Sequence, residues 1–149
     1  MKIKTVGTWD DELWQDASHL YLEAFGDKGA KPVHIIKNMF AQGIAELHVG
    51  YNESVAVVMA LTGKLVSDKV MIIDYLAVSE KERGYGLGKY LVDYLRQKAA
   101  SNWRRAVCVY QYLSSAIVSW RWEKRRLEVS FLALKVLQTL HQLFIINNI

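Results

Sequence analysis

The chain has 149 residues, of which 52% are hydrophobic and 23% are charged, with a formal net charge of +4. This size and apolar content suit one compact domain with a single core, and the mild positive charge suits an anionic ligand but is too diffuse to indicate nucleic acid. A single cysteine, Cys108, excludes an intrachain disulfide, and residues 1–5 lack the apolar core of a signal peptide, so we expect a cytoplasmic protein. Polar residues interrupt the apolar C-terminal stretch, so we expect no membrane span.

The N-terminal part of the sequence predicts a strand followed by a helix. Residues 2–6 alternate weakly between polar and apolar, which is typical of a strand. Thr8 and the pair Asp10 and Asp11 then provide N-cap chemistry, and apolar residues recur at helical spacing as far as Phe25. Gly26 is the stop signal of this helix.

A second helix and a hairpin follow. Pro32 suits the first turn of the helix, and Gly43 closes it. Residues 45–51 and 55–66 have the pattern of two strands, and the tight turn at residues 52–54 between them indicates an antiparallel hairpin.

The most distinctive run is Arg83-Gly84-Tyr85-Gly86-Leu87-Gly88, which follows a strand-like stretch at residues 70–78. A helix start leaves backbone N–H groups unpaired at the positive end of the helix dipole, so a glycine turn at this point can cradle phosphates. The alternating glycines match neither the dinucleotide motif nor the P-loop. A strand at residues 105–110 is expected to lie parallel to residues 70–78 after a helical crossover. One helical face, expected to pack on the sheet, carries Leu87, Tyr90, Leu91, Tyr94, Leu95 and Ala99.

The pattern R-x-x-G-x-G in this run, preceded by residues 75–78 and a short polar turn at residues 79–82, resembles the acetyl-CoA-binding motif of the GNAT superfamily of acetyl-CoA-dependent N-acetyltransferases. The resemblance covers about residues 1–105. It implies an α/β (α+β) fold in which helices flank a mixed central sheet, in the order β-α-α-β-β-β-α-β. We expect a single domain over residues 1–149, with a family-like core to residue 110 and an atypical tail.

The resemblance also implies acetyl-CoA as cosubstrate. In this family the sheet splays open beside the strand before the glycine turn, which leaves backbone groups free for the pantetheine amides, and the matching positions are Leu76, Ala77 and Val78. The pyrophosphate would bind to the backbone of Gly84, Tyr85, Gly86, Leu87, Gly88 and Lys89, with Arg83 as the leading basic residue. The alternative interpretation makes Arg83 a surface charge, and the Lys89 side chain is expected on a solvated helix surface.

Acetyl transfer to an amine needs a base that leaves the amine neutral. Asp74 is the only carboxylate in the strand at residues 70–78, and its two-residue spacing predicts that it shares a face with Leu76 and Val78. It is therefore the candidate base. A strand aspartate that only hydrogen-bonds to backbone is the alternative, and Glu23 and Glu46 stay open as other bases.

Residues 111–149 depart from the family pattern. Trp120 occupies the position where the usual tyrosine acid would be, and an indole cannot donate that proton, so Tyr110 and Tyr112 are the candidate acids, with packing roles as the alternative. Apolar residues at helical spacing predict an amphipathic helix, which would be buried within the monomer or across a homodimer interface. A shifted reading frame in the gene is one hypothesis for this tail.

Two functions from different classes follow. The first is an N-acetyltransferase that moves acetyl from acetyl-CoA to a primary amine of a small molecule or peptide by direct attack. The second is a non-catalytic or impaired acyl-CoA-binding module that has lost the usual C-terminal elements. Nucleic-acid binding through the basic and aromatic stretch at residues 120–126 is a weaker third interpretation. A charged helix face with tryptophan in the core is favoured over it, and we expect no nucleic-acid partner. The four histidines lack metal-ligand spacing, so no metal is expected.

Overall fold

A computed structural model describes residues 1–26, 29–65, 70–102 and 105–107, all of which belong to one compact unit. The predicted tail helix and the end of the strand expected at residues 105–110 lie outside the described residues. The predicted element order is confirmed as far as residue 107. The elements are β1 (Lys2–Val6), α1 (Asp11–Phe25), α2 (Val33–Ala41), β2 (Ala45–Asn52), β3 (Val55–Leu65), β4 (Val70–Val78), the short 3₁₀ helix η2 (Glu80–Glu82), α3 (Leu87–Asn102) and β5 (Arg105–Val107).

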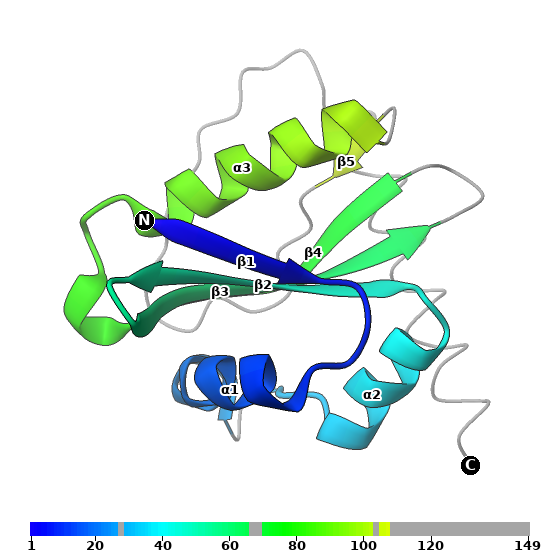
Figure 1. Ribbon diagram of the computed structural model, residues 1–149, viewed down its shortest axis with the longest axis horizontal. Coiled ribbons are helices and arrows are strands. Elements are labelled where there is room, and N and C mark those ends of the chain that lie inside the picture. The colour runs from blue at the N-terminus through cyan, green and yellow to red at the C-terminus, as the bar shows by residue number, and fades with distance from the viewer. Residues whose placement is uncertain (27–28, 66–69, 103–104, 108–149) are drawn as a thin grey trace. The chain divides into compact units, whose positions relative to one another are not determined.

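The strands form one sheet in the order β1-β2-β3-β4-β5. Strands β1 to β4 pair antiparallel, as short connections allow, whereas β5 pairs parallel with β4 after the crossover through α3. Figure 1 shows α1 and α2 on one face of the sheet and α3 on the other. The mixed sheet flanked by helices is the predicted fold class.

Local sequence signals set the ends of these elements. The Asp10 carboxylate accepts a hydrogen bond from the Leu13 amide at 2.9 Å, so it caps α1 as predicted. Gly26 follows the last residue of the helix. At the tip of the β2–β3 hairpin Glu53 has a φ of 55°, a left-handed conformation that a tight turn requires.

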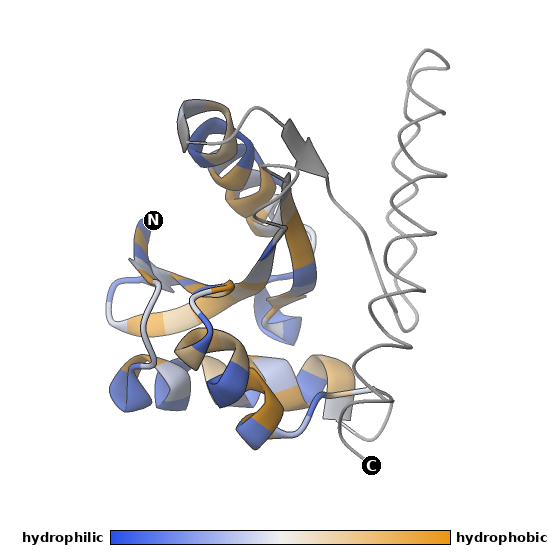
Figure 2. Cartoon of the chain, turned by 90° about the vertical axis from the view of Figure 1, so that its right-hand side faces the viewer, coloured by the Kyte–Doolittle hydropathy of each residue, from blue (hydrophilic) through white to orange (hydrophobic). Residues whose placement is uncertain are grey.

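The core on the α3 side lies between this helix and strands β3 and β4. Val58 and Ala60 of β3 and Met71 and Ile73 of β4 pack with an apolar stripe of α3 that contains Leu91, Leu95 and Ala99. Figure 2 shows hydrophobic residues concentrated on the sheet and on the helix faces turned toward it. The prediction that Tyr90 joins this stripe is wrong, because its side chain is 52% exposed at the edge of the helix face.

No helix within the described ranges has both the length and the apolar character needed to cross a bilayer.

Candidate functional site

Strand β4 carries a bulge that changes the direction of its side chains. Leu61 pairs with Tyr75 and Thr62 with Ile73, so Asp74 is the extra residue. Leu76 and Val78 consequently pack on the α3 side, in the core that contains Leu91 and Leu95, whereas Asp74 bonds to Lys31 on the α1–α2 side. The prediction that Asp74 shares a face with Leu76 and Val78 is wrong, because the bulge shifts the two-residue period by one.

The glycine run forms the turn that joins β4 to α3. Gly84 has a φ of 88° and Gly86 a φ of 81°, which L residues with a side chain rarely adopt. Gly88 lies over the end of β4, where an added Cβ would be 3.4 Å from Val78 Cγ2 and 3.9 Å from Leu76 Cδ2. Glycine at these positions therefore lets the start of α3 lie close against the last residues of the strand.

The start of α3 presents unpaired donors. The first backbone bond of the helix runs from the Tyr90 amide to the Gly86 carbonyl at 2.9 Å, and the N–H groups of residues 84–89 have no acceptor among the described residues. The first turn of α3 contains no acidic residue. The Lys89 side chain pairs with Asp93 at 2.5 Å on the exposed helix surface, as the sequence suggested. These donors and the helix dipole suit an anion.

Arg83 connects the glycine turn to β4 and α1 through hydrogen bonds. Its Nε donates to the Val78 carbonyl at 3.3 Å, and its Nη2 donates to Glu23 Oε1 of α1 at 3.2 Å. The same Glu23 oxygen accepts from the Glu80 amide at 3.0 Å. Glu23 is thus engaged in bracing the turn, which argues against its use as a base. A direct contact of the half-exposed Arg83 with phosphate stays a prediction.

Beside this turn, one edge of β4 has no partner strand within the described ranges. The pairing of β4 with β5 extends from Val70 to Ile72, and among the described residues no strand pairs with the same edge at residues 73–78. The other edge is paired with β3 throughout Leu76, Ala77 and Val78. Backbone groups of these three residues can therefore bind an extended amide chain, as predicted for pantetheine.

Asp74 is held by a lysine from the loop between α1 and α2. Its carboxylate accepts a hydrogen bond from Lys31 Nζ, and the side chains of Asp74 and Lys31 are 12% and 31% exposed. Sequence reasoning missed Lys31, because nothing in its local pattern signals a partner 43 positions away. Tyr110 and Tyr112, the candidate acids, lie outside the described residues.

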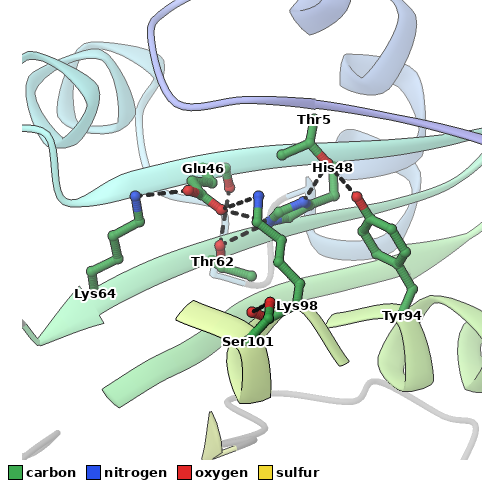
Figure 3. Close-up of polar contacts among 8 residues, drawn as sticks. All are labelled: Thr5, Glu46, His48, Thr62, Lys64, Tyr94, Lys98 and Ser101. Carbon is green, nitrogen blue, oxygen red and sulfur yellow. Dashed lines mark hydrogen bonds and ion pairs between the residues drawn. The ribbon is translucent and has the colours of Figure 1, made fainter. Parts of the chain in front are cut away.

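A second polar cluster lies between α3 and strands β1 to β3 (Figure 3). His48 is fully buried, with Thr5 Oγ1 at 2.9 Å from Nδ1 and Thr62 Oγ1 at 2.9 Å from Nε2. Thr62 donates its hydroxyl hydrogen to the Glu46 carbonyl at 3.4 Å, so we assign the His48 proton to Nε2. Nδ1 then accepts from Thr5, whose hydroxyl accepts from Tyr94 Oη at 3.3 Å. Both ring nitrogens of a neutral His48 therefore have a hydrogen-bond partner.

Burial and the two lysines beside His48 favour its neutral form, and the negative charge of Glu46 opposes them without outweighing them. Burial, together with the nearby Lys98, lowers the pKa of His48 to about 3. Glu46 pairs with Lys64 at 2.7 Å and with Lys98 at 2.9 Å (Figure 3). Burial raises the pKa of Glu46, but the hydrogen bonds from the two lysines outweigh it and leave that pKa lowered.

The same cluster places Glu46 far from the glycine turn. Its partner Lys98 lies nine residues along α3 from Lys89, or about 14 Å at the helical rise. Glu46 is engaged by two lysines on the α3 side of the sheet, opposite to the side on which Asp74 lies, which argues against its use as the base. Among the described residues no group of three or more His, Cys, Asp or Glu side chains could hold a metal ion.

Comparison with known proteins places these features in a family context. A model described as the acetyltransferase (GNAT) family matches residues 9–110. No curated protein sequence matches the chain.

Solved structures share the fold at low sequence identity. An aminoglycoside acetyltransferase from an uncultured soil metagenomic sample has a TM-score of 0.60 and 17% identity, over 74% of this chain and 77% of that one. A ribosomal-protein-alanine N-acetyltransferase from Brucella melitensis has a TM-score of 0.57 and 19% identity, over 76% and 83% of the two chains. An aminoglycoside 6'-N-acetyltransferase from Acinetobacter haemolyticus has a TM-score of 0.58 and 16% identity, over 74% and 79%.

Proposed function

Since the chain belongs to the GNAT acetyltransferase family, we propose that it binds acetyl-CoA at the start of α3 and transfers the acetyl group to a primary amine of a small molecule or peptide. The observation that carries this proposal is the juxtaposition, within the part of the chain that the structure describes, of N–H groups without an acceptor at residues 84–89 and a β4 edge without a partner strand at Leu76–Val78. The helix start would hold the pyrophosphate, and the strand edge would hold the pantetheine amides. Both anchors are backbone groups, which matches the glycine content of the turn.

The proposed chemistry is direct attack of the amine on the thioester. Asp74 lies on β4, upstream of the pantetheine positions, and its carboxylate already accepts a hydrogen bond from an ammonium group. We assign it the role of general base, which takes the proton that the acceptor ammonium must lose. The proton required by the leaving thiolate would come from Tyr110 or Tyr112.

Acetyl-CoA binding is tested by thermal unfolding with acetyl-CoA, ATP, NAD or no ligand. A ligand at 100 times its Kd adds about 2.7 kcal/mol to the stability of the native state, so acetyl-CoA alone is expected to raise the Tm. The informative variant is Gly86→Asp, because its carboxylate would compete for the N–H groups of α3 and repel phosphate, while Asp tolerates a positive φ better than most residues.

Gly43→Asp is the matched control. Gly43 also has a positive φ, 70°, and an added Cβ would meet nothing within 4 Å at either glycine. The control variant is expected to keep the acetyl-CoA shift and Gly86→Asp to lose it. A wild-type shift in Gly86→Asp, or no shift in the wild type at saturating acetyl-CoA, rejects the proposed binding site.

Turnover is tested separately by thiol release from acetyl-CoA. The names of the structural neighbours suggest two acceptors, an aminoglycoside and a peptide that begins with alanine. Replacing Asp74 by Asn is expected to lower the rate about 100-fold or more, in the range of general-base contributions. Unchanged turnover would reject Asp74 as the base.

A non-catalytic acyl-CoA-binding module is the second candidate function. The observation in its favour is that the family match ends at residue 110, so the family's C-terminal elements are not matched in residues 111–149. This function predicts the same acetyl-CoA shift but no thiol release with any amine.

A further inference from the structure

The segment between α1 and α2 is tied to the protein through two tyrosine hydroxyls. Tyr21, which is 1% exposed, accepts a hydrogen bond from the Lys31 amide at 2.6 Å and donates to the Lys31 carbonyl at 3.3 Å. Tyr75 of β4 donates to the Gly29 carbonyl at 3.0 Å. The two rings contact each other edge to face, with centroids 5.0 Å apart. A buried hydroxyl thus fixes both backbone groups of Lys31.

The Lys31 side chain is fixed as well. Its ammonium bonds to Asp74 and lies 5.2 Å from the centroid of the Tyr75 ring. Asp74 has no other hydrogen-bond or ion-pair partner among the described residues. A lysine side chain held in this way loses up to about 2 kcal/mol of rotamer entropy, so backbone and side-chain contacts together are needed to hold it at the strand.

This ammonium lies at the place that the proposed mechanism gives to the acceptor. Asp74 is four residues before Val78, or about 13 Å along a strand. A coenzyme whose pyrophosphate binds at the start of α3 would lay its extended pantetheine arm along the open β4 edge, from Val78 back toward Asp74. The thioester would therefore approach the end of the strand where Lys31 holds a primary amine against a carboxylate.

We propose that Lys31 is an autoacetylation site, an inference that rests on the proposed function. Asp74 takes a proton from the Lys31 ammonium, and the neutral amine attacks the thioester carbonyl. An N–C bond forms and the C–S bond breaks, and the proton that the attacking nitrogen still has to lose is taken up by the leaving thiolate. The products are Nζ-acetyl-Lys31 and free coenzyme A, and Asp74 returns the proton it took to solvent. The resulting amide carries no charge, so the ion pair is lost and Asp74 is released to bind the ammonium of another acceptor.

The experiment incubates the full chain with acetyl-CoA and no acceptor amine and follows acetylation of each lysine by peptide mass spectrometry. Lys37 is a matched internal control, because it also pairs with an aspartate, Asp11 at 3.6 Å, and lies over a ring, Trp9 at 4.8 Å. Its side chain is 49% exposed, against 31% for Lys31, so uncatalysed acetylation would label Lys37 at least as fast.

The proposal predicts that Lys31 is acetylated at least 10-fold faster than Lys37, at a first-order rate that does not change with protein concentration. Asp74→Asn should reduce labelling of Lys31 to about the rate of Lys37, since the general base is then lost. Gly86→Asp should reduce it to the rate of Lys37, and Lys31→Arg should leave no fast site.

Labelling of Lys31 no faster than Lys37, or undiminished labelling in Gly86→Asp, overturns the proposal. Thermal shift and thiol release on the same samples separate it from the proposed function. Acetyl-CoA binding and turnover with an unmodified Lys31 would reject only the autoacetylation site, whereas absence of acetyl-CoA binding would reject both.

Discussion

Lowering the pH from 7 to 5 should destabilise this protein through one histidine, His48. In the folded chain its pKa falls from 6.5 to about 3, because it is fully buried and lies near the positive charge of Lys98. The unfolded chain therefore binds more protons than the folded chain between these two values. Stability from this group is fully present above pH 6.5, decreases as the pH falls, and is lost below pH 3.

The size of the effect follows from the pKa difference. A pH of 5 lies about 1.5 units below the pKa of His48 in the unfolded chain, and each unit is worth about 1.4 kcal/mol. The free energy of unfolding is therefore about 2 kcal/mol lower at pH 5 than at pH 7. That is about a fifth of the roughly 10 kcal/mol that stabilises a typical domain. The window ends at pH 5 because Glu46, whose pKa is lowered from 4.5, adds its own loss below that pH.

The assay is urea unfolding at pH 7 and pH 5 for the wild type, His48→Gln and His34→Gln. His48→Gln should be less stable at pH 7, because it disturbs bonds to Thr5 and Thr62, but it should lose the pH dependence of the free energy of unfolding. His34 is exposed, so its variant should behave like the wild type. Equal wild-type stability at the two pH values, or an unchanged pH dependence in His48→Gln, would refute the assignment of a buried neutral histidine.

Three further substitutions test the packing and capping. Asp10→Ala should cost about 1 kcal/mol by removing the cap on the Leu13 amide; an unchanged urea midpoint would show that this bond is not formed. Leu91→Ala, at a fully buried position of α3, should cost about 2–5 kcal/mol in the same assay, and a loss below 1 kcal/mol would contradict its burial. Gly50→Ala should also destabilise, by roughly 1–3 kcal/mol, since its Cβ would lie 2.6 Å from Val58 Cγ1; a neutral result would contradict the close strand packing.

Local sequence signals predicted most of the fold as far as residue 107. The cap at Asp10 and the stop at Gly26 were visible because they depend on neighbouring residues. The strand at residues 70–78 was confirmed with the predicted first and last residues, because polar turns on both sides of the apolar run define where the strand begins and ends. The positive φ values at Gly84 and Gly86 agree with the interpretation of the run as a turn.

The arrangement of side chains at the candidate site could not be predicted in the same way. No residue near Asp74 signals the bulge in the sequence. The regular alternation of side chains along a strand therefore assigned Asp74 to the wrong face of the sheet. The pair of Lys31 with Asp74 and the pair of Arg83 with Glu23 join residues 43 and 60 positions apart. Such contacts depend on how the helices pack on the sheet, and one sequence does not reveal that packing.

The most direct test of the central claim is amide hydrogen exchange with and without acetyl-CoA. Bound acetyl-CoA should slow exchange at the N–H groups of residues 84–89, which have no acceptor among the described residues. The amide of Gly43, which donates to the Phe40 carbonyl at 2.9 Å, serves as the reference and should exchange at the same rate in both samples. Saturating binding of acetyl-CoA with unchanged exchange at residues 84–89 would contradict the claim that the start of α3 holds the coenzyme.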